Sequence, residues 1–451
     1  MSKLSCFKAY DIRGRIPGEL NEELAYRIGQ SYAAFVKPRR VAVGRDIRAT
    51  SATLAAALTR GLNDSGVNVV DIGLCGTEGV YYATFAEQLD GGIMVTASHN
   101  PPDYNGMKFV REQSKPISAD TGLKDMQSLI ESGRLPPAAT AKGSSVALDI
   151  NRQYIAHLLS YVKGATLRKL KVVVNAGNGG AGMVVDQLEP HLPFEFIKVH
   201  HNADSSFPNG VPNPMIEANR ASTINAIRSS GADIGLAWDG DFDRCFFFDE
   251  HGGFVEGYYL VGLLAEAFLK RYPGGRIVHD PRLTWNTLDI VRRCGGEAVL
   301  SRSGHAFIKQ VMREVDAVYG GEMSAHHYFR DFAYCDSGMI PWLLVLAVMG
   351  ERGRTLGELV GERQRLFPCS GEINREISDA RAATARVQQH YAAQALKLDF
   401  TDGLSMEFAQ WRLNLRSSNT EPLVRLNVES RGSEALMQEK TAEVLRLMEA
   451  V

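Results

Sequence analysis

Apolar runs that change into helix-forming stretches recur three times along the chain. Strand-like runs at 40–44, 171–175 and 276–280 open the three segments. After a helical stretch, each segment continues with a second short strand, at 67–72, 194–199 and 297–300. Alternating strands and helices of this kind predict α/β layers with mainly parallel sheets.

A third strand in each segment ends in an unusual polar loop. The apolar runs 92–95, 234–237 and 317–319 lead to Ser98, Asp239 and Glu322, respectively. Ligands of such sheets gather beyond the carboxyl ends of strands, so we expect the three loops to face one cleft. The segments are too long for a solenoid, which favours tandem duplicated domains. Chance similarity among ordinary βα units is the alternative, and three polar loops in register weigh against it.

The pattern changes after about residue 367. A helix-like stretch at 379–396, strand-like runs at 405–415 and 423–429, and a closing helix at 433–448 predict a smaller α+β unit. The predicted fold class is therefore α/β: three similar tandem α/β domains with mixed, mainly parallel sheets, plus a C-terminal α+β domain, around a central active-site cleft. The expected domains are 1–146, 147–252, 253–366 and 367–451.

Composition narrows the possible partners. The chain has 451 residues, with 52 acidic against 50 basic side chains, which argues against nucleic acid and favours small ligands. Its six cysteines show no CxxC spacing, so neither a zinc site nor a disulfide framework is indicated. The longest apolar stretch, 339–349, is shorter than the roughly 20 residues that span a bilayer. We expect a soluble, cytoplasmic protein with no membrane partner.

Ser98 is a lone hydroxyl at a strand end among turn-forming residues. No base in the nearby sequence makes the usual serine hydrolase. The segment Asp239 to Arg244, in contrast, offers a metal site suited to phosphate chemistry. A serine that carries phosphate agrees with both observations.

The alternating aspartates Asp239, Asp241 and Asp243 predict a magnesium site, because three carboxylates on a loop suit a hard cation. An EF-hand is the rival, since these residues and Glu250 occupy its positions 1, 3, 5 and 12. Arg244 replaces its required glycine, however, and the flanking runs resemble strands rather than helices. A solvated acidic turn remains the simpler alternative.

Other polar segments carry weaker signals. The turn at 416–420 groups donors that suit a non-reacting phosphate, although a plain hairpin explains it equally well: Arg416, Ser418, Asn419 and Thr420. The alternating Glu322, Ser324 and His326 could contact two sugar hydroxyls and carry a proton, with a structural histidine as the alternative. Tyr10 and Arg13 precede a glycine turn, and Lys108 follows Ser98 closely.

Five motifs together resemble one family. The segments 10–14, 96–101, 239–244, 321–326 and 416–420 occur in the order and approximate spacing of the α-D-phosphohexomutases, in particular the bacterial phosphomannomutase/phosphoglucomutase group. The resemblance covers nearly the whole chain. It implies that Ser98 is phosphorylated in the active enzyme and that one Mg²⁺ is held by the three aspartates and this phosphate.

The resemblance also implies an activity. The expected function is reversible interconversion of mannose 6-phosphate and mannose 1-phosphate through a hexose 1,6-bisphosphate, which also acts as activator. Phosphoglucomutase activity, as main or second activity, is the alternative. A metal-dependent sugar phosphatase and a non-catalytic sugar-phosphate sensor are rivals from other classes. Mannose 1-phosphate would feed GDP-mannose synthesis, and the chain would act as monomer or dimer.

Individual roles follow from the same resemblance. Glu322 and Ser324 would recognise hexose hydroxyls, and the phosphate clamp at 416–420 would accept either end of the sugar. Lys108, then His326, are candidates for proton transfer, with Arg13 in support; we expect Arg244 to lower the pKa of Lys108. Further residues match family positions at the cleft: Tyr10, Arg282, His305 and Lys309. Met323 favours mannose or glucose over glucosamine, and Ala325 departs from the usual glycine.

Overall fold

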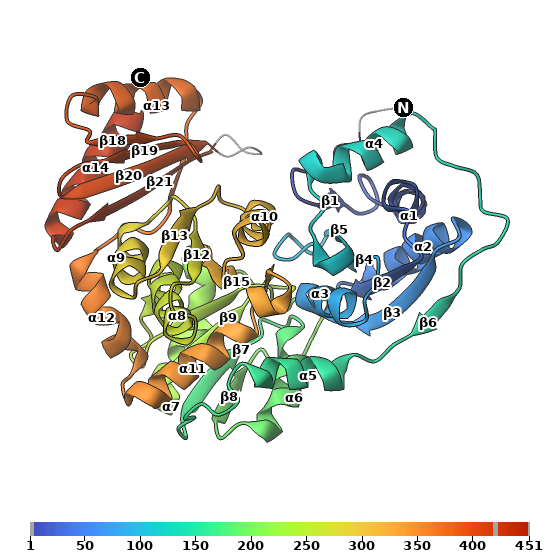
Figure 1. The fold of residues 1–451 in the computed structure, drawn as a ribbon, viewed down its shortest axis with the longest axis horizontal. Coiled ribbons are helices and arrows are strands. Elements are labelled where there is room, and N and C mark those ends of the chain that lie inside the picture. The colour runs from blue at the N-terminus through green and yellow to red at the C-terminus, as the bar shows by residue number, and fades with distance from the viewer. Residues whose placement is uncertain (1–3, 418–422, 450–451) are drawn as a thin grey trace. The chain divides into compact units, whose positions relative to one another are not determined.

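The computed structural model describes residues 4–417 and 423–449. The chain forms two compact units (Figure 1). The first unit contains Met1–Gly253 and Phe329–Gly353, and the second contains Phe254–Tyr328 and Arg354–Val451. Each unit is described separately.

Two sheets form the centre of the first unit. The strands of the first sheet are β1 (Ile12–Arg15), β2 (Arg40–Arg45), β3 (Asn68–Leu74), β4 (Gly91–Val95), β5 (Tyr104–Arg111) and β6 (Ser145–Ala147). Those of the second are β7 (Lys171–Asn175), β8 (Glu195–Val199), β9 (Ile234–Trp238) and β10 (Cys245–Phe248). The short strand β16 (Cys335–Asp336) also belongs to this unit, and β15 (His327–Phe329) ends in it.

Helices surround these sheets. They are α1 (Glu22–Val36), α2 (Ser51–Asp64), α3 (Thr77–Ala86), α4 (Lys124–Glu131), α5 (Asn151–Ser160), α6 (Ala181–Leu188), α7 (Ala221–Ser230) and α11 (Ile340–Arg352). Short helical turns lie at η1 (Glu112–Ser114), η2 (Ala119–Leu123), η3 (Glu189–His191), η4 (Glu217–Arg220) and η5 (Arg330–Phe332). The apolar stretch at 339–349 lies in the buried helix α11, and no helix within 4–417 and 423–449 has the length and apolar character needed to cross a membrane.

The second unit has a parallel sheet followed by an antiparallel one. Its first strands are β11 (Phe254–Val255), β12 (Arg276–His279), β13 (Glu297–Leu300) and β14 (Tyr319–Gly321). The antiparallel sheet contains β17 (Ile373–Glu376), β18 (Lys397–Asp399), β19 (Leu404–Glu407), β20 (Trp411–Ser417) and β21 (Leu423–Ser430). The helices are α8 (Gly257–Arg271), α9 (Trp285–Arg293), α10 (His305–Val315), α12 (Leu356–Leu366), α13 (Ala380–Tyr391) and α14 (Glu434–Glu449).

The predicted threefold repeat is present in the strand pairing. In each of the three parallel arrangements the first strand lies between the second and the third: β2 between β3 and β4, β7 between β8 and β9, and β12 between β13 and β14. The strands β4 and β9 are buried along their whole length, as expected for a strand covered on both faces. The three polar loops therefore follow equivalent strands.

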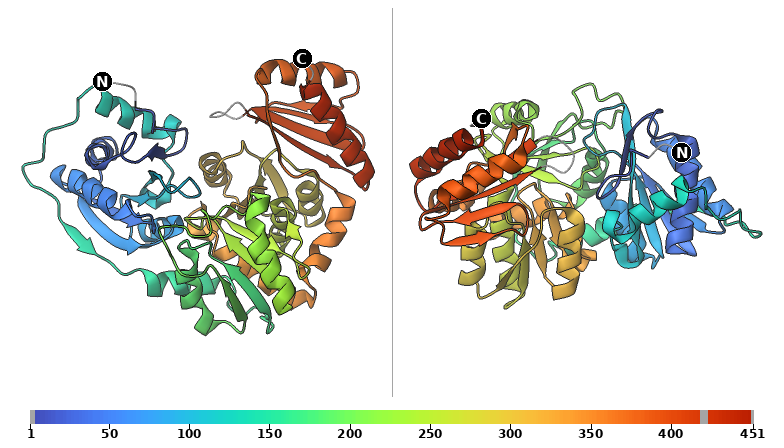
Figure 2. Two further views of the ribbon diagram at one scale, coloured as in Figure 1. Left: turned by 180° about the vertical axis from the view of Figure 1, so that it is seen from behind. Right: turned by 90° about the horizontal axis from the view of Figure 1, so that it is seen from above.

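The C-terminal domain is α+β as predicted, but its sheet contains strands that the sequence did not indicate, β17 and β18. Helices α13 and α14 pack on one face of this sheet, as Figures 1 and 2 show. The strand expected at 405–415 is wrong: the chain forms the antiparallel pair β19 and β20 instead. Phe408 N donates to the Trp411 carbonyl across the turn between them. The segment 408–410 contains neither glycine nor proline, so the sequence carried no turn signal.

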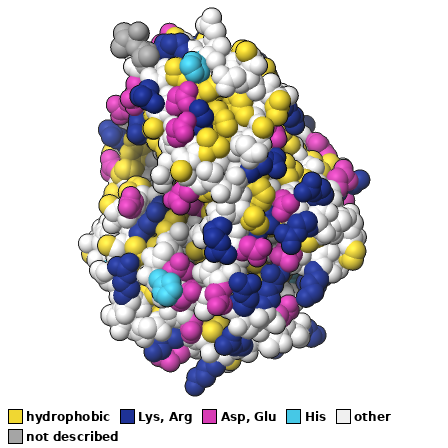
Figure 3. Space-filling view, turned by 90° about the vertical axis from the view of Figure 1, so that its left-hand side faces the viewer, with side chains coloured by type: hydrophobic (Ala, Val, Ile, Leu, Met, Phe, Trp, Pro, Cys, Tyr) yellow, Lys and Arg dark blue, Asp and Glu magenta, His cyan; other side chains and the backbone are white. Residues whose placement is uncertain are grey.

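Charge is distributed evenly over the surface in view. On the face drawn in Figure 3, acidic, basic and hydrophobic side chains are interspersed. This agrees with the formal net charge of −2. The six cysteines are all free thiols.

Candidate functional site

Ser98 lies three residues beyond β4, where its side chain enters a cluster of ionised groups. Its hydroxyl donates to Asp239 Oδ2 at 3.0 Å and lies 3.0 Å from His99 Nδ1. Its backbone is left-handed, with φ of 48°. The loop that carries Ser98 also meets the loop after β9, because a Cβ added to Gly240 would lie 2.4 Å from the Ser98 carbonyl oxygen. Two loops from two sheets thus form one centre.

Three carboxylates converge in the loop between β9 and β10. Asp239, Asp241 and Asp243 are buried, and one oxygen of each lies within 4.8 Å of the others. Asp241 Oδ1 is buried and accepts no hydrogen bond, whereas Asp241 Oδ2 accepts from Thr77 Oγ1 at 2.6 Å. Clustered carboxylate oxygens with a buried acceptor still available fit a magnesium ion. The strands that flank the loop, β9 and β10, exclude an EF-hand.

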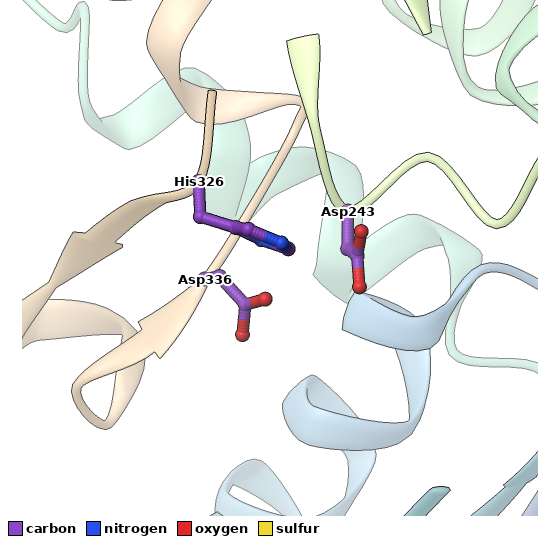
Figure 4. A group of neighbouring side chains, drawn as sticks. All are labelled: Asp243, His326 and Asp336. Atoms are coloured by element: carbon purple, nitrogen blue, oxygen red, sulfur yellow. The ribbon is translucent and has the colours of Figure 1, made fainter. Parts of the chain in front are cut away.

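Asp336 brings a further carboxylate to this loop from β16. One of its oxygens lies within 4.8 Å of an Asp243 oxygen (Figure 4). Asp243 follows β9 by five residues, whereas Asp336 is more than 90 residues away in the chain. No local pattern in the sequence pointed to Asp336.

Lys108 neutralises part of this negative charge from β5. Its Nζ donates to Asp241 Oδ2 and to Asp243 Oδ2, both at 2.6 Å. Burial alone would lower the pKa of Lys108, but the two carboxylates outweigh it and raise the pKa above its ordinary value. The predicted lowering of this pKa is therefore wrong. Arg244, the group expected to cause it, pairs with Asp239 at 2.7 Å instead.

The pKa values of Asp239 and Asp241 are shifted in opposite directions. Burial raises the pKa of Asp239 to about 6, although Arg244 opposes this shift. Burial also disfavours ionisation of Asp241, but Lys108 outweighs it and lowers the pKa of that carboxyl. For His99, burial and then the nearby Arg244 guanidinium lower the pKa well below its usual range. The centre is thus a tightly coupled set of charges.

Arg13 on β1 braces the loop of Ser98. Its Nη1 donates to the Ala97 carbonyl at 2.7 Å and to Asn100 Oδ1 at 2.5 Å, and its Nε donates to Asp11 Oδ2. Tyr10 is half-buried two residues before this strand. Arg13 was expected to support proton transfer, and the contacts observed for it hold the loop.

The loop that we expect to recognise the sugar lies in the second unit, directly after β14. Glu322 Oε1 accepts from Gly304 N at 2.8 Å and from Arg282 Nη2 at 3.2 Å, and Glu322 Oε2 accepts from Tyr328 at 2.5 Å. Arg282 Nη2 also lies 3.2 Å from Ser324 Oγ. The two residues expected to recognise hydroxyls are therefore joined through one guanidinium. Ala325, at the position where glycine was expected, has a left-handed φ of 69°.

The remaining predicted residues of this unit lie around α10 and β20. The rings of His305 and His326 are 6.4 Å apart, and Lys309 is fully buried on α10. Arg416 contacts Asp402 Oδ2 at 3.2 Å and Glu372 Oε2 at 3.3 Å. Ser418, Asn419 and Thr420 lie outside the described residues.

Glu372 is a residue that sequence reasoning missed. It accepts from Arg282 Nη1 at 3.4 Å as well as from Arg416, and Arg425 lies 3.9 Å away. Burial would raise the pKa of Glu372, but the arginines outweigh it and lower that pKa. One carboxylate thus joins Arg282, which contacts Glu322 and Ser324, to Arg416, the arginine expected to bind phosphate.

Family models match almost the entire chain. The models for phosphoglucomutase/phosphomannomutase alpha/beta/alpha domains I, II and III match residues 5–134, 152–253 and 256–367, and the model for the C-terminal domain matches residues 372–447. The chain belongs to the phosphoglucomutase/phosphomannomutase family. The family that the five motifs indicated and the fold class of three α/β domains plus a C-terminal domain are both confirmed.

Individual relatives agree over their full length. A phosphomannomutase of Salmonella montevideo is 58% identical over 454 residues, which cover 99% of this chain and 100% of the relative. A protein of Xanthomonas campestris named phosphohexose mutases is 58% identical over 449 residues, 99% of each chain. The solved structure of a phosphoglucomutase/phosphomannomutase family protein from Burkholderia thailandensis has a TM-score of 0.88 at 31% identity, covering 100% of this chain and 99% of that one.

Proposed function

We propose that this chain is a phosphomannomutase, an isomerase that interconverts mannose 6-phosphate and mannose 1-phosphate through a phosphate on Ser98. The observation that carries the proposal is the Ser98 hydroxyl, 3.0 Å from Asp239 in a buried loop of three converging carboxylates. Its occurrence in a chain 58% identical to a relative named phosphomannomutase supports mannose as the sugar.

Asp239, Asp241 and Asp243, together with the phosphate on Ser98, would hold one Mg²⁺. The ion would supply neutralisation of the negative charge on the transferring phosphoryl group. The buried Asp241 Oδ1, which accepts no hydrogen bond, supports this ligand set. Arg244 is the cation of this loop best placed to stabilise the same charge, since it already pairs with Asp239 at 2.7 Å.

In the proposed reaction, Ser98 Oγ gives its phosphoryl group to the free hydroxyl of a hexose monophosphate. The bond from phosphorus to Oγ breaks, a bond to the sugar oxygen forms, and the sugar hydroxyl loses its proton. The resulting hexose 1,6-bisphosphate reorients in the site and returns its other phosphate to Ser98. Catalysis of such a transfer depends on positioning and charge stabilisation.

The raised pKa of Lys108 changes the predicted division of proton transfer. A lysine held between Asp241 and Asp243 stays protonated near neutral pH, which suits it to stabilise negative charge. His326, the second candidate, is then the group proposed to accept the proton of the sugar hydroxyl. Arg13 supports the transfer by holding the Ser98 loop.

Recognition of the sugar and of the non-transferring phosphate is assigned to the second unit. Glu322 and Ser324 would contact two hexose hydroxyls, with Arg282 orienting both side chains. Arg416 and the residues Ser418, Asn419 and Thr420 would hold the phosphate at either end of the sugar. Further substrate contacts are proposed for Tyr10, His305 and Lys309.

Several finer features belong to the same proposal. Hexose 1,6-bisphosphate would act as activator, and mannose 1-phosphate would supply GDP-mannose synthesis in the cytoplasm. The chain would work as monomer or dimer, with domains 1–146, 147–252, 253–366 and 367–451. Phosphoglucomutase activity is the second candidate, because the matching family models name both sugars.

A substrate panel tests the proposal. Purified protein with Mg²⁺ and a trace of hexose 1,6-bisphosphate is assayed on mannose, glucose and glucosamine phosphates, and released inorganic phosphate is measured in parallel. We expect the highest kcat/KM on mannose phosphates, almost no free phosphate, and a phosphate on Ser98 by mass spectrometry.

Variants separate the rivals. Ser98→Ala should abolish interconversion, whereas Ser128→Ala, on the exposed face of α4, should not affect it. Free phosphate at the rate of substrate loss would identify a phosphatase. Full activity in Ser98→Ala would contradict the phosphoserine mechanism.

A further inference from the structure

Arg48 is a buried cation in the turn after β2 that the proposed reaction does not use. Its Nη1 donates to the carbonyl oxygens of Pro101 at 2.8 Å and Tyr104 at 2.9 Å. Its Nη2 donates to the carbonyl oxygens of Ser98 at 2.8 Å and Asn100 at 2.5 Å. Ser98, Asn100 and Pro101 belong to the loop between β4 and β5, and Tyr104 is the first residue of β5. One guanidinium therefore fixes the backbone of the loop that carries the reactive hydroxyl.

The backbone conformation of Ser98 explains why this loop needs hydrogen bonds that hold its backbone. A residue with a side chain in the left-handed region costs on the order of 1–3 kcal/mol, a cost that glycine avoids. Ser98 has φ of 48° and needs its hydroxyl, so glycine cannot replace it. The surrounding contacts must therefore hold the strained backbone.

A second contact holds Ser98 from its other side. Ser98 N donates to Thr96 Oγ1 at 2.9 Å, and Thr96 Oγ1 donates its own proton to Asp46 Oδ2 at 2.6 Å. Asp46 Oδ1 accepts from Ser51 Oγ at 2.5 Å and from Arg48 N at 3.0 Å. The proton on Thr96 therefore points toward Asp46, which leaves the threonine oxygen to accept from Ser98. Both peptide groups that flank the Ser98 side chain are fixed.

The same arrangement occurs in the second unit. Asp46 and Arg48 follow β2, and Asp280 and Arg282 follow the equivalent strand β12. In both turns the arginine N–H donates to the aspartate Oδ1, at 3.0 and 2.9 Å. Arg282 then contacts Glu322 and Ser324 in the loop after the third strand, as Arg48 contacts the Ser98 loop. An Asp-x-Arg turn thus holds the functional loop in each case.

We propose that Arg48, assisted by Asp46 and Thr96, is a positioning residue that keeps Ser98 Oγ in line for phosphoryl transfer. Arg48 acts through backbone carbonyls and contacts no reacting atom. Displacing a reacting group by about 1 Å can lower a rate about 100-fold, which sets the expected size of the effect. The inference rests on the proposed role of Ser98 as phosphate carrier.

Arg48→Lys is the main test, because a lysine keeps the charge but its single ammonium cannot span four carbonyl oxygens. We expect kcat to fall about 100-fold and KM to stay within about threefold, since Arg48 holds the phosphoryl-carrying loop rather than the sugar. Arg45→Met is the matched control: Arg45 ends the same strand, is partly exposed and pairs with Asp71 at 3.6 Å. Its kcat should equal that of the wild type.

Three readouts separate positioning from general stability. Thr96→Val should lower kcat while Thr96→Ser, which keeps the acceptor, should retain it. Ethylguanidinium should restore part of the turnover of Arg48→Ala, and amide hydrogen exchange over 96–104 should be faster in Arg48→Lys than in Arg45→Met.

The outcomes are distinct. Wild-type-like kcat in both Arg48→Lys and Thr96→Val overturns the inference, as does an equal loss in Arg45→Met. If Arg48→Lys does not fold, the Thr96→Val and Thr96→Ser pair decides. An inactive wild type overturns the proposed function instead, and this failure appears without any substitution.

Discussion

The two units contain the same Asp-x-Arg turn but direct its arginine to different partners. In the first unit, Arg48 donates to neutral backbone carbonyls of the Ser98 loop. In the second, Arg282 pairs with the carboxylates of Asp280, Glu322 and Glu372. The first arrangement fixes backbone geometry, whereas the second also sets the charge around the loop. A repeated scaffold has therefore been adapted to two tasks.

The two units also differ in the arrangement of their charged side chains. The first unit gathers carboxylates around Lys108, a pattern suited to a metal ion and a moving phosphoryl group. In the second unit, Arg282, Arg416 and Arg425 converge on Glu372. A phosphate that binds Arg416 must compete with this carboxylate. We expect substitutions around the carboxylate loop of the first unit to lower turnover and those around Glu372 in the second to change affinity.

The largest effect is expected for Asp241→Asn in the first unit. The change removes a carboxylate that Lys108 keeps ionised, so kcat/KM should fall about a thousandfold or more. Affinity for Mg²⁺, or for Mn²⁺ as a spectroscopic probe, should fall in parallel by calorimetry or EPR titration. Asp125→Asn, on exposed α4, should change neither quantity. Unaltered metal affinity in Asp241→Asn would show that the loop is not the metal site.

Arg416→Met tests the second unit. Loss of a charge-assisted hydrogen bond of about 1.5–3 kcal/mol should raise KM about 10- to 100-fold. Steady-state kinetics at saturating substrate should show a smaller change in kcat. Arg375→Met is the control, because Arg375 lies on the same sheet and pairs with exposed Glu449. A fall in kcat alone would remove the proposed division between the units.

Glu372→Gln sharpens the comparison further. Glutamine keeps the shape of the side chain but removes the negative charge that competes for Arg416 and Arg282. We expect KM for hexose phosphates to fall about threefold, since partly exposed ion pairs contribute little. Glu376→Gln, exposed on β17, should leave KM unchanged. A higher KM in Glu372→Gln would mean that this carboxylate orients the arginines rather than competing for them.

The smallest effect on turnover is expected for Glu78→Gln, which alters stability instead. Glu78 accepts from Tyr154 without a cation, and burial raises its pKa to about 8. Glu429 in the second unit also accepts from a tyrosine, Tyr258, but pairs with Arg412 at 2.9 Å. The uncompensated carboxyl of Glu78 should make stability depend on pH.

The direction of this pH dependence follows from the raised pKa of Glu78. The folded state keeps a proton on Glu78 that the unfolded state loses above about 4.5, so this group's contribution to stability is lost as pH rises to about 8. The difference between the melting temperatures of Glu78→Gln and the wild type should therefore increase steadily in favour of the variant from pH 5 to pH 8. Exposed Glu112→Gln should show no such trend.

Local patterns predicted the fold well. Eight of the nine strands of the three repeats and the closing helix occur where alternation and apolar runs placed them, because burial dictates residue type along each element. The ninth strand, expected at 317–319, is β14 and begins two residues later. The hairpin at 408–410 was missed because Phe408, Ala409 and Gln410 carry no turn chemistry. Phe408 and Trp411 stack across this turn, with their ring centroids 4.2 Å apart.

Contacts between residues that are far apart in the sequence could not be predicted for the site. Ser98 and the three aspartates were visible because each stands in a dense polar motif. The contact between Lys108 and Asp241 spans 133 residues, and that between Arg282 and Glu372 spans 90, so neither left a local signal. The two Asp-x-Arg turns did carry a signal, since they follow the first strand of their repeats.

The contact at Gly240 also constrains how this protein can be recombined. A side chain at that position would meet the Ser98 carbonyl at 2.4 Å, so the backbones of the two loops are complementary at atomic distance. A chimera that joined the Ser98 loop of this chain to the aspartate loop of a distant relative would combine two loops whose backbones are not matched to each other. Crossover points that keep both loops from one parent should yield functional hybrids far more often than points between them.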